Sequence, residues 1–323
     1  MSTVRGHRSP ALPLSGTAPL VSVVIAAVDG ASPTEALVSV LAQRGVRLDV
    51  VVVTDADPVV TPVVADERVR RVDVPAGTGA IAARNAGLAV VRGESVLVLP
   101  STGALTAGAL ERAAALLAAH PWVTAVHGDA EISVRPATAP SGRVDWTLWS
   151  GADWIERTSR HGSDLLVDHA VLVRRSIADA LGGYAEDLPR TADLDYGLRL
   201  AALGGIGRIS GVVQTRCHPQ PSTDPLAELR ERRGTIEHFF TSAGHDSSGR
   251  RAQGGDRRAN AGRALAQEAM GWALRSRASA RPEDHAEGAR FASVAAECWP
   301  AVVDTAEWRR FVRAGDRARR PLS

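Results

Sequence analysis

The chain has 323 residues, which is enough for one large α/β domain with an appendage or for two modest domains. Its formal net charge is +2, because 38 basic residues, all of them arginine, nearly balance 36 acidic ones, and this balance argues against a nucleic-acid partner for the chain as a whole. No apolar run reaches the ~20 residues of a membrane helix, and the two widely spaced cysteines form neither a disulfide framework nor a zinc pattern, so we expect a cytoplasmic protein without a transmembrane segment.

The first part of the chain alternates apolar strands with helices. A disordered tail over residues 1–19 is expected to precede a buried strand at 21–28, VSVVIAAV. The following predicted elements are a helix at 32–45, strands at 49–57 and 69–75, a Gly-rich turn and helix at 76–93, a strand at 95–99 and a helix at 106–119. This alternation predicts a sheet with right-handed parallel crossovers, in which ligands bind at the carboxyl ends of the strands.

The second part of the chain is less regular. Its predicted elements are a strand within 122–134, loops over 135–165, a strand, helix and Gly-Gly turn over 168–189, a helix at 191–205, a strand at 208–219 and an amphipathic helix at 224–244. Residues 245–262 are rich in Gly, Ser and Arg and predict a flexible linker. Residues 263–323 then predict a helical C-terminal appendage.

Seven stretches, in order along the chain, resemble glycosyltransferase family 2, whose members are inverting enzymes with the GT-A fold. They are VSVVIAAVDG, LVSVLAQ, VVVVTDAD, GTGAIAARNAGLAVVRGESVLVLP, VLVRRSIADALGGYAEDLP, ADLDYGLRLAALG and TRCHPQPST. The resemblance implies an α/β fold with a GT-A-like (Rossmann-like) mixed, mostly parallel sheet and flanking helices, plus the helical appendage. It covers residues 20–244, with a nucleotide-sugar half over 20–134 and an acceptor half over 135–244.

The resemblance also implies roles for individual residues. Asp55 matches the carboxylate that binds the nucleobase, with Asp29 as the other acid left in that pocket. Arg84 matches the arginine beside the pyrophosphate, and its planar guanidinium suits phosphate oxygens. Asp193 matches the general base that deprotonates the acceptor hydroxyl, and His218 matches a histidine that approaches the metal or the phosphates.

One departure from the family pattern concerns the metal. The family's Asp-x-Asp motif, which holds Mg²⁺ or Mn²⁺ against the donor phosphates, falls on Pro100, Ser101 and Thr102. These residues supply no carboxylate, whereas such ions usually keep one or two. This departure predicts that the chain has no metal ligand at this corner, and no cofactor is certain. Thr102 is instead expected to contact the nucleotide sugar.

Each of these residues also has a simpler interpretation. Asp193 and Asp195 are first-turn acids of a helix, which are common in any protein, although the resemblance implies that Asp195 contacts the donor too. Arg84 follows a Gly-rich turn, where an arginine is often only solvated. The arginine-rich run at 250–258 fits a solvated linker better than a membrane or phosphate-binding face.

Two functions of different classes follow. The first is an inverting glycosyltransferase that takes a sugar from a nucleotide sugar without a bound metal. The second is a non-catalytic GT-A-like scaffold or partner of an active glycosyltransferase; a nucleotidyltransferase is a weaker third interpretation. The first is favoured because Asp55, Arg84 and Asp193 are retained. The acceptor stays open among glycans, lipid-linked molecules and small molecules, as do peripheral membrane contact and the oligomeric state.

Overall fold

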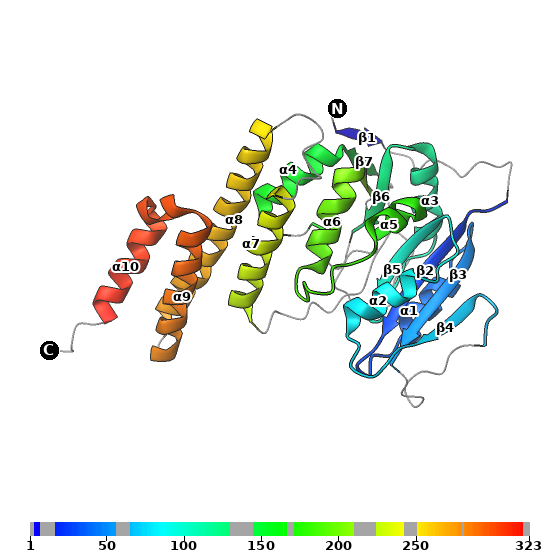
Figure 1. The fold of residues 1–323 in the computed structure, drawn as a ribbon, viewed down its shortest axis with the longest axis horizontal. Coiled ribbons are helices and arrows are strands. Elements are labelled where there is room, and N and C mark those ends of the chain that lie inside the picture. Colours follow the sequence, from blue (N-terminus) through cyan, green and yellow to red (C-terminus); the bar gives the residue numbers. More distant parts are fainter. Residues whose placement is uncertain are drawn as a thin grey trace. The chain divides into compact units, whose positions relative to one another are not determined.

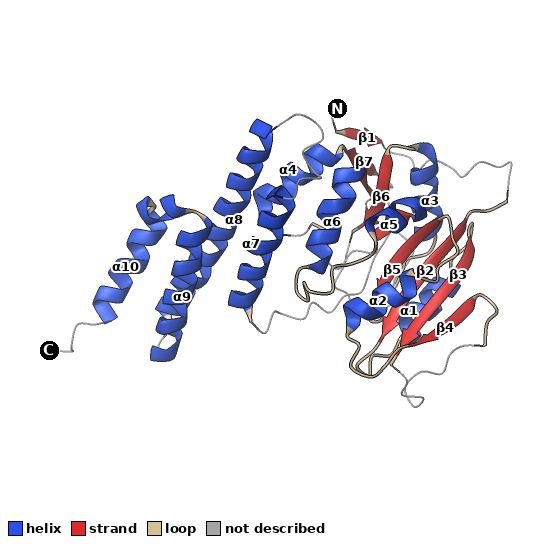
Figure 2. Cartoon of the chain, in the orientation of Figure 1, coloured by secondary structure: helices blue, strands red, loops and turns tan. Residues whose placement is uncertain are grey.

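The computed structural model describes residues 3–6, 17–55, 65–129, 145–163, 165–166, 171–209, 224–241, 251–279 and 281–318. The chain divides into two compact units. The first unit comprises Met1–Trp154 and Leu166–Gln220, and the second comprises Ile155–Leu165 and Pro221–Ser323. The first unit contains the β-sheet, and the described elements of the second are helical (Figure 1 and Figure 2).

The sheet of the first unit is mixed. Its nine strands in the described residues have the order β1-β7-β9-β6-β8-β5-β2-β3-β4. The strands are β1 (Val4–Gly6), β2 (Leu20–Ala27), β3 (Arg47–Thr54), β4 (Val69–Asp73), β5 (Ser95–Pro100), β6 (Val123–Gly128), β7 (Trp146–Trp149), β8 (Val171–Arg174) and β9 (Gly205–Ile209). Strands β2 to β5 pair in parallel, as predicted, whereas β8 runs antiparallel to both β5 and β6.

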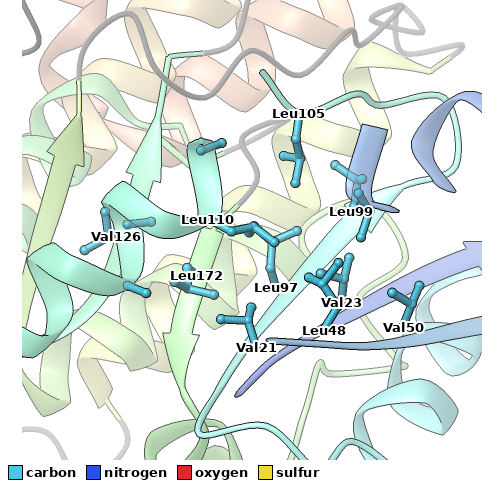
Figure 3. Close-up of a cluster of buried hydrophobic side chains, with 14 of the residues drawn as sticks. Val21, Val23, Leu48, Val50, Leu97, Leu99, Leu105, Leu110, Val126 and Leu172 are labelled. Carbon is cyan, nitrogen blue, oxygen red and sulfur yellow. The ribbon is translucent and has the colours of Figure 1, made fainter. Parts of the chain in front are cut away.

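Helices cover both faces of this sheet. The helices of the first unit are α1 (Thr34–Leu41), α2 (Ala80–Leu88), α3 (Ala109–Ala119), α5 (Arg175–Leu181) and α6 (Ala192–Leu203), and α4 (Gly151–His161) passes from the first unit into the second. Successive strand residues point to opposite faces. Val23 therefore belongs to the core cluster that includes Leu110 of α3 (Figure 3) and also Leu37 of α1. Val24, on the other face, lies against Gly87 of α2.

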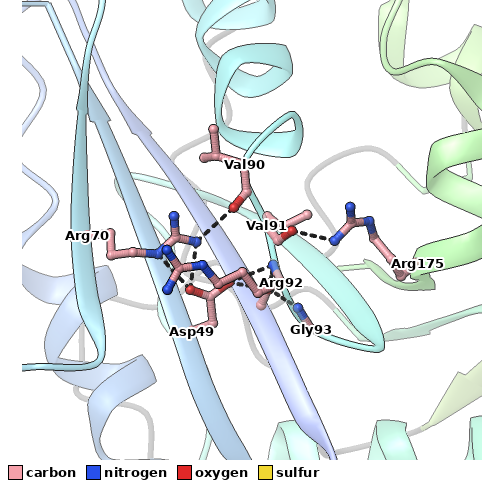
Figure 4. A network of polar contacts seen from close by, with 8 residues as sticks. Asp49, Arg70, Val90, Val91, Arg92, Gly93 and Arg175 are labelled. Atoms are coloured by element: carbon pink, nitrogen blue, oxygen red, sulfur yellow. Dashed lines mark hydrogen bonds and ion pairs between the residues drawn. The ribbon is translucent and has the colours of Figure 1, made fainter.

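A buried polar network joins three strands at the opposite end of the sheet from the predicted site. The Ser22 hydroxyl donates to the Asp49 carboxylate at 2.6 Å, and Arg70 donates to the same carboxylate at 2.7 and 2.9 Å (Figure 4). The backbone N–H of Arg92 donates to Asp49 at 2.9 Å, and that of Gly93 donates to the Ser22 hydroxyl at 2.8 Å. These bonds fix the loop between α2 and β5 against β2, β3 and β4.

Helix α2 approaches the sheet closely because it carries Gly87. A Cβ atom at this position would lie 2.3 Å from Cγ1 of Val24 and 3.0 Å from Cγ2 of Val53. Both valines are fully buried and β-branched, so their methyl groups have little freedom to move. The close approach of α2 to the sheet thus depends on a glycine at this position.

We expect Gly87→Ala to lower the free energy of unfolding by about 1–3 kcal/mol, because overpacking exceeds the helix-propensity gain of alanine. Chemical denaturation would measure the loss. Gly234→Ala is the matched control, since that glycine is also helical but nothing lies within 4 Å of the Cβ position. The control should be neutral or slightly stabilising, and equal losses in both variants would contradict the packing argument.

The structure differs from the sequence prediction at residues 4–6 and at residues 146–161. Residues Val4–Gly6 lie in the predicted disordered tail but form β1, which pairs with β7 and places Gly6 against the Trp146 indole. Strand β7 and helix α4 lie within the predicted loop region, where Trp149 and Trp154 are buried with ring centroids 5.2 Å apart. Burial of these aromatic rings orders a segment whose polar composition predicted loops.

The second unit contains α7 (Pro225–Thr241), α8 (Arg251–Ala278), α9 (Pro282–Cys298), the short 3-10 helix η1 (Pro300–Asp304) and α10 (Ala306–Ala318). Arg232 of α7 is buried and bonds both carboxylate oxygens of Glu268 on α8 at 2.7 and 2.9 Å. Trp272 and Phe291 stack between α8 and α9 with centroids 5.8 Å apart. Helix α8 begins inside the predicted linker of residues 245–262, so this part of the linker prediction is wrong.

The order in α8 has a tertiary cause. Its first half is rich in Gly and Arg, which favours a linker by composition, but Ala261, Leu265 and Ala266 are fully buried against neighbouring helices. Within the described residues, no helix of either unit is long and apolar enough to cross a membrane.

Candidate active site

The polar ends of three parallel strands meet at one edge of the first unit's sheet. Ala27 at the end of β2 pairs with Thr54 at the end of β3, and Ala26 pairs with Pro100 at the end of β5. Because these strands are parallel, the residues that follow them share the edge where α/β sheets bind ligands. The predicted site residues Asp29, Asp55 and Thr102 therefore all lie at this edge.

Asp29 and Asp55 are directly connected. The backbone N–H of Asp29 donates to Oδ2 of Asp55 at 3.0 Å. Asp29 has a φ of +56°, in the left-handed region that aspartate tolerates better than most residues. The structure thus brings these two predicted residues together, with the Asp55 carboxylate joining the ends of β2 and β3.

The corner that follows β5 is a tight turn. The N–H of Gly103 donates to the carbonyl of Pro100 at 2.8 Å, and Thr102 is exposed at the tip of the turn. No residue from 100 to 103 carries a carboxylate. Among the described residues, no group of three or more His, Cys, Asp or Glu side chains could hold a metal ion.

Arg84 and Asp193 form an ion pair at this edge. Arg84 lies on α2 and Asp193 in the first turn of α6, 109 positions apart in the sequence. Nη1 of Arg84 lies 3.0 Å from Oδ1 and 3.2 Å from Oδ2 of the Asp193 carboxylate. The Arg84 side chain is 20% exposed and that of Asp193 is 43% exposed, so both reach the solvent. The structure therefore joins the predicted phosphate-binding cation to the predicted base.

Two tyrosines next to this ion pair were not predicted from the sequence. Tyr184 and Tyr196 stack with ring centroids 4.3 Å apart and planes inclined by 22°. The Arg84 guanidinium lies 5.5 Å from the Tyr184 centroid, and the Arg199 guanidinium lies 5.5 Å from that of Tyr196. A guanidinium over a tyrosine face is attracted by the ring quadrupole. The sequence did contain one signal that could have indicated these residues. They are the only two tyrosines of the chain, and they lie on either side of Asp193 in the sequence.

Tyr196 is a neutral member of this stack. Burial raises the pKa of Tyr196 to about 12, and the opposing effect of the Arg199 cation is smaller. The phenol therefore stays protonated at neutral pH, which excludes Tyr196 as a base. The role of base stays a prediction for Asp193.

Asp195 supports the site from within the fold. Its carboxylate bonds Nε and Nη2 of Arg199 at 2.7 and 2.6 Å, and the residue is only 9% exposed. Arg199 in turn donates to the carbonyls of Leu181 and Gly183, each at 2.9 Å. Asp195 thus fixes the segment that carries Tyr184, while its contact with a donor stays a prediction.

Asn85 holds the same segment from α2. Its side chain donates to the Tyr184 carbonyl at 2.9 Å and to Glu186 at 2.9 Å, and it accepts the Tyr184 N–H at 2.8 Å. Gly183 has a φ of +91°, and a Cβ atom there would lie 2.6 Å from Oδ1 of Asn85. The Gly-Gly turn of the sequence is therefore needed both for its backbone conformation and for the close approach of Asn85.

We expect Asn85→Ala to release the segment around Tyr184 without unfolding the sheet. Removing the amide leaves the Tyr184 backbone groups unsatisfied, at a cost of about 1–3 kcal/mol. Hydrogen exchange should show this release as a roughly 10- to 100-fold loss of protection at the Tyr184 amide, with protection in β2 and β3 unchanged. Unchanged exchange at Tyr184 would contradict the role given to Asn85.

A small cavity of about 50 Å³ opens beside the ion pair, with room for only a few water molecules. It is lined by Arg84, Val98, Pro100, Leu166, Val171, Tyr184, Asp193, Tyr196, Gly197 and Leu200. The remaining predicted site residue, His218, lies outside the described residues.

A comparison with protein families decides the classification of the chain. Residues 22–182 match the family model Glycosyl transferase family 2. The chain belongs to glycosyltransferase family 2. The matched residues include Asp29, Asp55 and Arg84 and extend to the Gly-Gly turn before Tyr184. The family inferred from the sequence is therefore confirmed.

Three individual proteins are similar to this chain. The succinoglycan biosynthesis protein ExoO of Rhizobium meliloti (strain 1021) is 37% identical over 99 residues, which are 29% of this chain and 28% of that protein. The mannosyltransferase PcManGT from Pyrobaculum calidifontis, solved in complex with GDP-Man and Mn²⁺, matches with a TM-score of 0.51 at 20% identity, over 95% of this chain and 88% of that one. Residues 1–349 of S. aureus TarS in complex with UDP match with a TM-score of 0.49 at 15% identity, over 88% and 91%. The likeness to PcManGT confirms the GT-A fold predicted for the chain.

Proposed function

We propose that this family 2 protein transfers a sugar from a nucleotide sugar to an acceptor hydroxyl by an inverting displacement. The observation that carries the proposal is the position of Arg84 and Asp193 at the carboxyl edge of the sheet, 3.0 Å apart. One residue is a cation suited to a diphosphate, and the other is an exposed carboxylate suited to a proton. Their joint position supplies the two groups that this reaction needs.

The chemistry assigns each group one step. The Asp193 carboxylate accepts the proton of the acceptor hydroxyl as the oxygen attacks the anomeric carbon of the donor. The bond between that carbon and the diphosphate oxygen breaks, and the electron pair leaves with the nucleoside diphosphate. The Arg84 guanidinium offsets the negative charge that develops on this leaving group.

The ion pair makes the two steps dependent on each other. In the structure Asp193 accepts both of its contacts with Arg84 from Nη1, and Tyr184 lies beside the same guanidinium. A diphosphate that binds Arg84 competes with Asp193 for it. We infer that donor binding frees the carboxylate to act on the acceptor.

The residues at the β5 corner do not fit a divalent metal ion. The turn Pro100–Gly103 offers hydroxyl and carbonyl oxygens but no carboxylate, and Oδ2 of Asp55 is already bonded to the N–H of Asp29. Mg²⁺ and Mn²⁺ prefer hard oxygen ligands that include one or two carboxylates. We therefore propose that Arg84 stabilises the negative charge on the leaving diphosphate, and no step of the proposed reaction uses a metal ion.

The remaining parts of the proposal rest on the sequence and the relatives. PcManGT was solved with GDP-Man, which is consistent with a nucleotide-sugar donor here. Residues 20–244 form the transferase domain of the proposal, with a donor half over 20–134 and an acceptor half over 135–244. Asp29, Asp55 and Thr102 border the donor at the strand ends. The acceptor and the cytoplasmic location stay predictions from the sequence.

One observation favours a second function, that of a non-catalytic GT-A-like scaffold or partner of an active glycosyltransferase. The β5 corner lacks carboxylates, as expected of a GT-A-like scaffold that has lost catalysis. A scaffold has no need to bind a nucleotide, so donor binding separates the two functions.

The test is a calorimetric titration of the purified chain with UDP, GDP and dTDP, each with and without Mn²⁺. We expect micromolar affinity for one nucleotide regardless of metal, and about 10-fold or greater weakening in Arg84→Ala, since a charge-assisted hydrogen bond contributes about 1.5–3 kcal/mol. Asp55→Ala should also weaken binding, and Arg44→Ala is the matched control, because Arg44 is exposed and precedes β3, at the end of the sheet opposite the predicted site. No binding of any of the three nucleotides would overturn the donor site and favour the scaffold.

A further inference from the structure

Arginine is concentrated at the C-terminal end of the second unit. Residues 309–320, RRFVRAGDRARR, contain six arginines and one acidic residue, whereas the whole chain has 38 arginines in 323 residues. Half of this segment is arginine, against about one residue in nine overall, so general arginine richness does not account for it. Its described part, up to Ala318, belongs to α10.

One side of α10 is packed within the second unit. The helix starts after Thr305, whose hydroxyl accepts the N–H of Trp308 at 3.2 Å. Phe311 is buried, and the Arg277 guanidinium of α8 lies 4.8 Å from its ring centroid. A Cβ atom on Gly315 would lie 3.3 Å from the same guanidinium. This packed side fixes which residues α10 presents to solvent.

The other side of α10 is basic. Arg309, Arg310 and Arg313 are exposed and, among the described side chains, form no ion pair with an acid; we call these three residues the basic face. Val312 lies beside them in sequence and is 44% exposed, and Val303 of η1 is 42% exposed. The surface near the start of α10 therefore combines arginines with exposed apolar side chains.

The acids of the same region do not cancel this charge. Asp304 and Glu307 are exposed at the start of α10, where a negative charge suits the positive end of the helix dipole. Glu307 lies three residues before Arg310 on the helix and offsets part of its charge, but residues 304–320 as a whole carry six arginines against three acids. Beyond Asp304 and Glu307, the only acid of residues 309–320 is Asp316.

We propose that the basic face of α10 binds an anionic lipid surface. The basic face belongs to a segment, residues 309–320, with six arginines, and clusters of four to eight basic residues are attracted to anionic headgroups by about 1 kcal/mol per residue. Val312 and Val303 favour a lipid surface over a nucleic acid, because a bilayer offers an apolar phase beneath its charged headgroups and a nucleic-acid backbone does not. This inference does not depend on the proposed glycosyl transfer, since it concerns where the second unit binds.

The experiment measures binding of the full chain to vesicles of phosphatidylcholine alone and of phosphatidylcholine with phosphatidylglycerol. We expect binding only to the anionic vesicles, and we expect it to weaken as salt screens the charges. The triple variant Arg309→Gln, Arg310→Gln and Arg313→Gln should bind on the order of 100-fold more weakly. The single variant Val312→Ser should bind several-fold more weakly, which tests the apolar contribution without changing the charge.

The matched control is the triple variant Arg44→Gln, Arg230→Gln and Arg290→Gln, which removes the same charge from exposed positions on other elements. It should bind like the wild type, and thermal unfolding should show that all variants are folded. Equal losses in the two triple variants would overturn the proposal, because net charge alone would then explain binding. Indifference to phosphatidylglycerol, or tighter binding to duplex DNA than to the anionic vesicles at the same salt, would overturn it as well.

Discussion

Asp193→Asn is expected to lose glycosyl transfer by about 10²- to 10⁴-fold in kcat while keeping its affinity for the nucleoside diphosphate. The substitution keeps the size and shape of the side chain but removes its ability to accept a proton. It also weakens the contact with Arg84 and so leaves that guanidinium more available to the diphosphate. Steady-state kinetics with a donor found by the titration would measure the loss, and calorimetry would measure the retained binding.

The control for this prediction is Asp187→Asn. Asp187 is an exposed acid on the segment before α6 and has no place in the proposed machinery. Its substitution should leave kcat within about 2-fold of the wild-type value, because substitutions of exposed residues outside a functional site usually have small effects. Full activity of Asp193→Asn would show that another group removes the proton, and the assignment of Asp193 would then be wrong.

Asp49→Ala is expected to cause the largest loss of stability, with the free energy of unfolding falling by about 3–5 kcal/mol. The Asp49 side chain is 8% exposed and accepts bonds from Ser22, from the N–H of Arg92 and from Arg70. Removing it takes the carboxylate partner from the Arg70 cation and one acceptor from each of the other two donors, of which the Arg92 N–H keeps only its 3.1 Å bond to the Ser22 hydroxyl. Urea denaturation would measure the change.

Asp73→Ala is the matched control. Asp73 also pairs with an arginine of β4, Arg71, but the Asp73 side chain is 59% exposed. An exposed pair contributes less than about 1 kcal/mol, so the control should be nearly neutral. Similar losses in the two variants would contradict the role of burial in the Asp49 network.

The Asp49 network also makes stability depend on pH. Burial alone would raise the pKa of Asp49, but bonds from Ser22, Arg70 and the Arg92 N–H outweigh it, and the pKa falls below its ordinary value of 3.8. A carboxyl with a lowered pKa stabilises the fold above its unfolded pKa, and this contribution disappears as the pH falls through the folded pKa. The wild type should therefore lose stability below about pH 4 more steeply than Asp49→Asn, which cannot titrate there.

Most strands and most helices could be predicted because their signals are local. The run Val50–Val53 is apolar throughout and becomes a strand buried on both faces. The segments that were missed depend on distant contacts instead. β1 exists because it pairs with β7, which lies far along the chain, and α8 exists because its small residues are buried against other helices. No local pattern reports such contacts.

The candidate site was also only partly predictable from the sequence. The resemblance named Arg84 and Asp193 separately, but their ion pair joins side chains from two helices and needs the folded sheet to bring them together. The stack of Tyr184 on Tyr196 also depends on side-chain geometry, although the scarcity of tyrosine in the chain was a usable signal. The sequence thus predicted the chemical groups and not how they contact one another.

The most direct test of the central claim is a turnover assay. Wild-type protein and Asp193→Asn would each be incubated with UDP-, GDP- and dTDP-sugars and an extract of candidate acceptors, and release of the nucleoside diphosphate would be followed with and without EDTA. We predict release from one class of donor by the wild type, unaffected by EDTA and lost in the variant. Folded wild-type protein that releases no nucleoside diphosphate from any donor, or that releases it only with added metal, would contradict the assignment of Arg84 and Asp193.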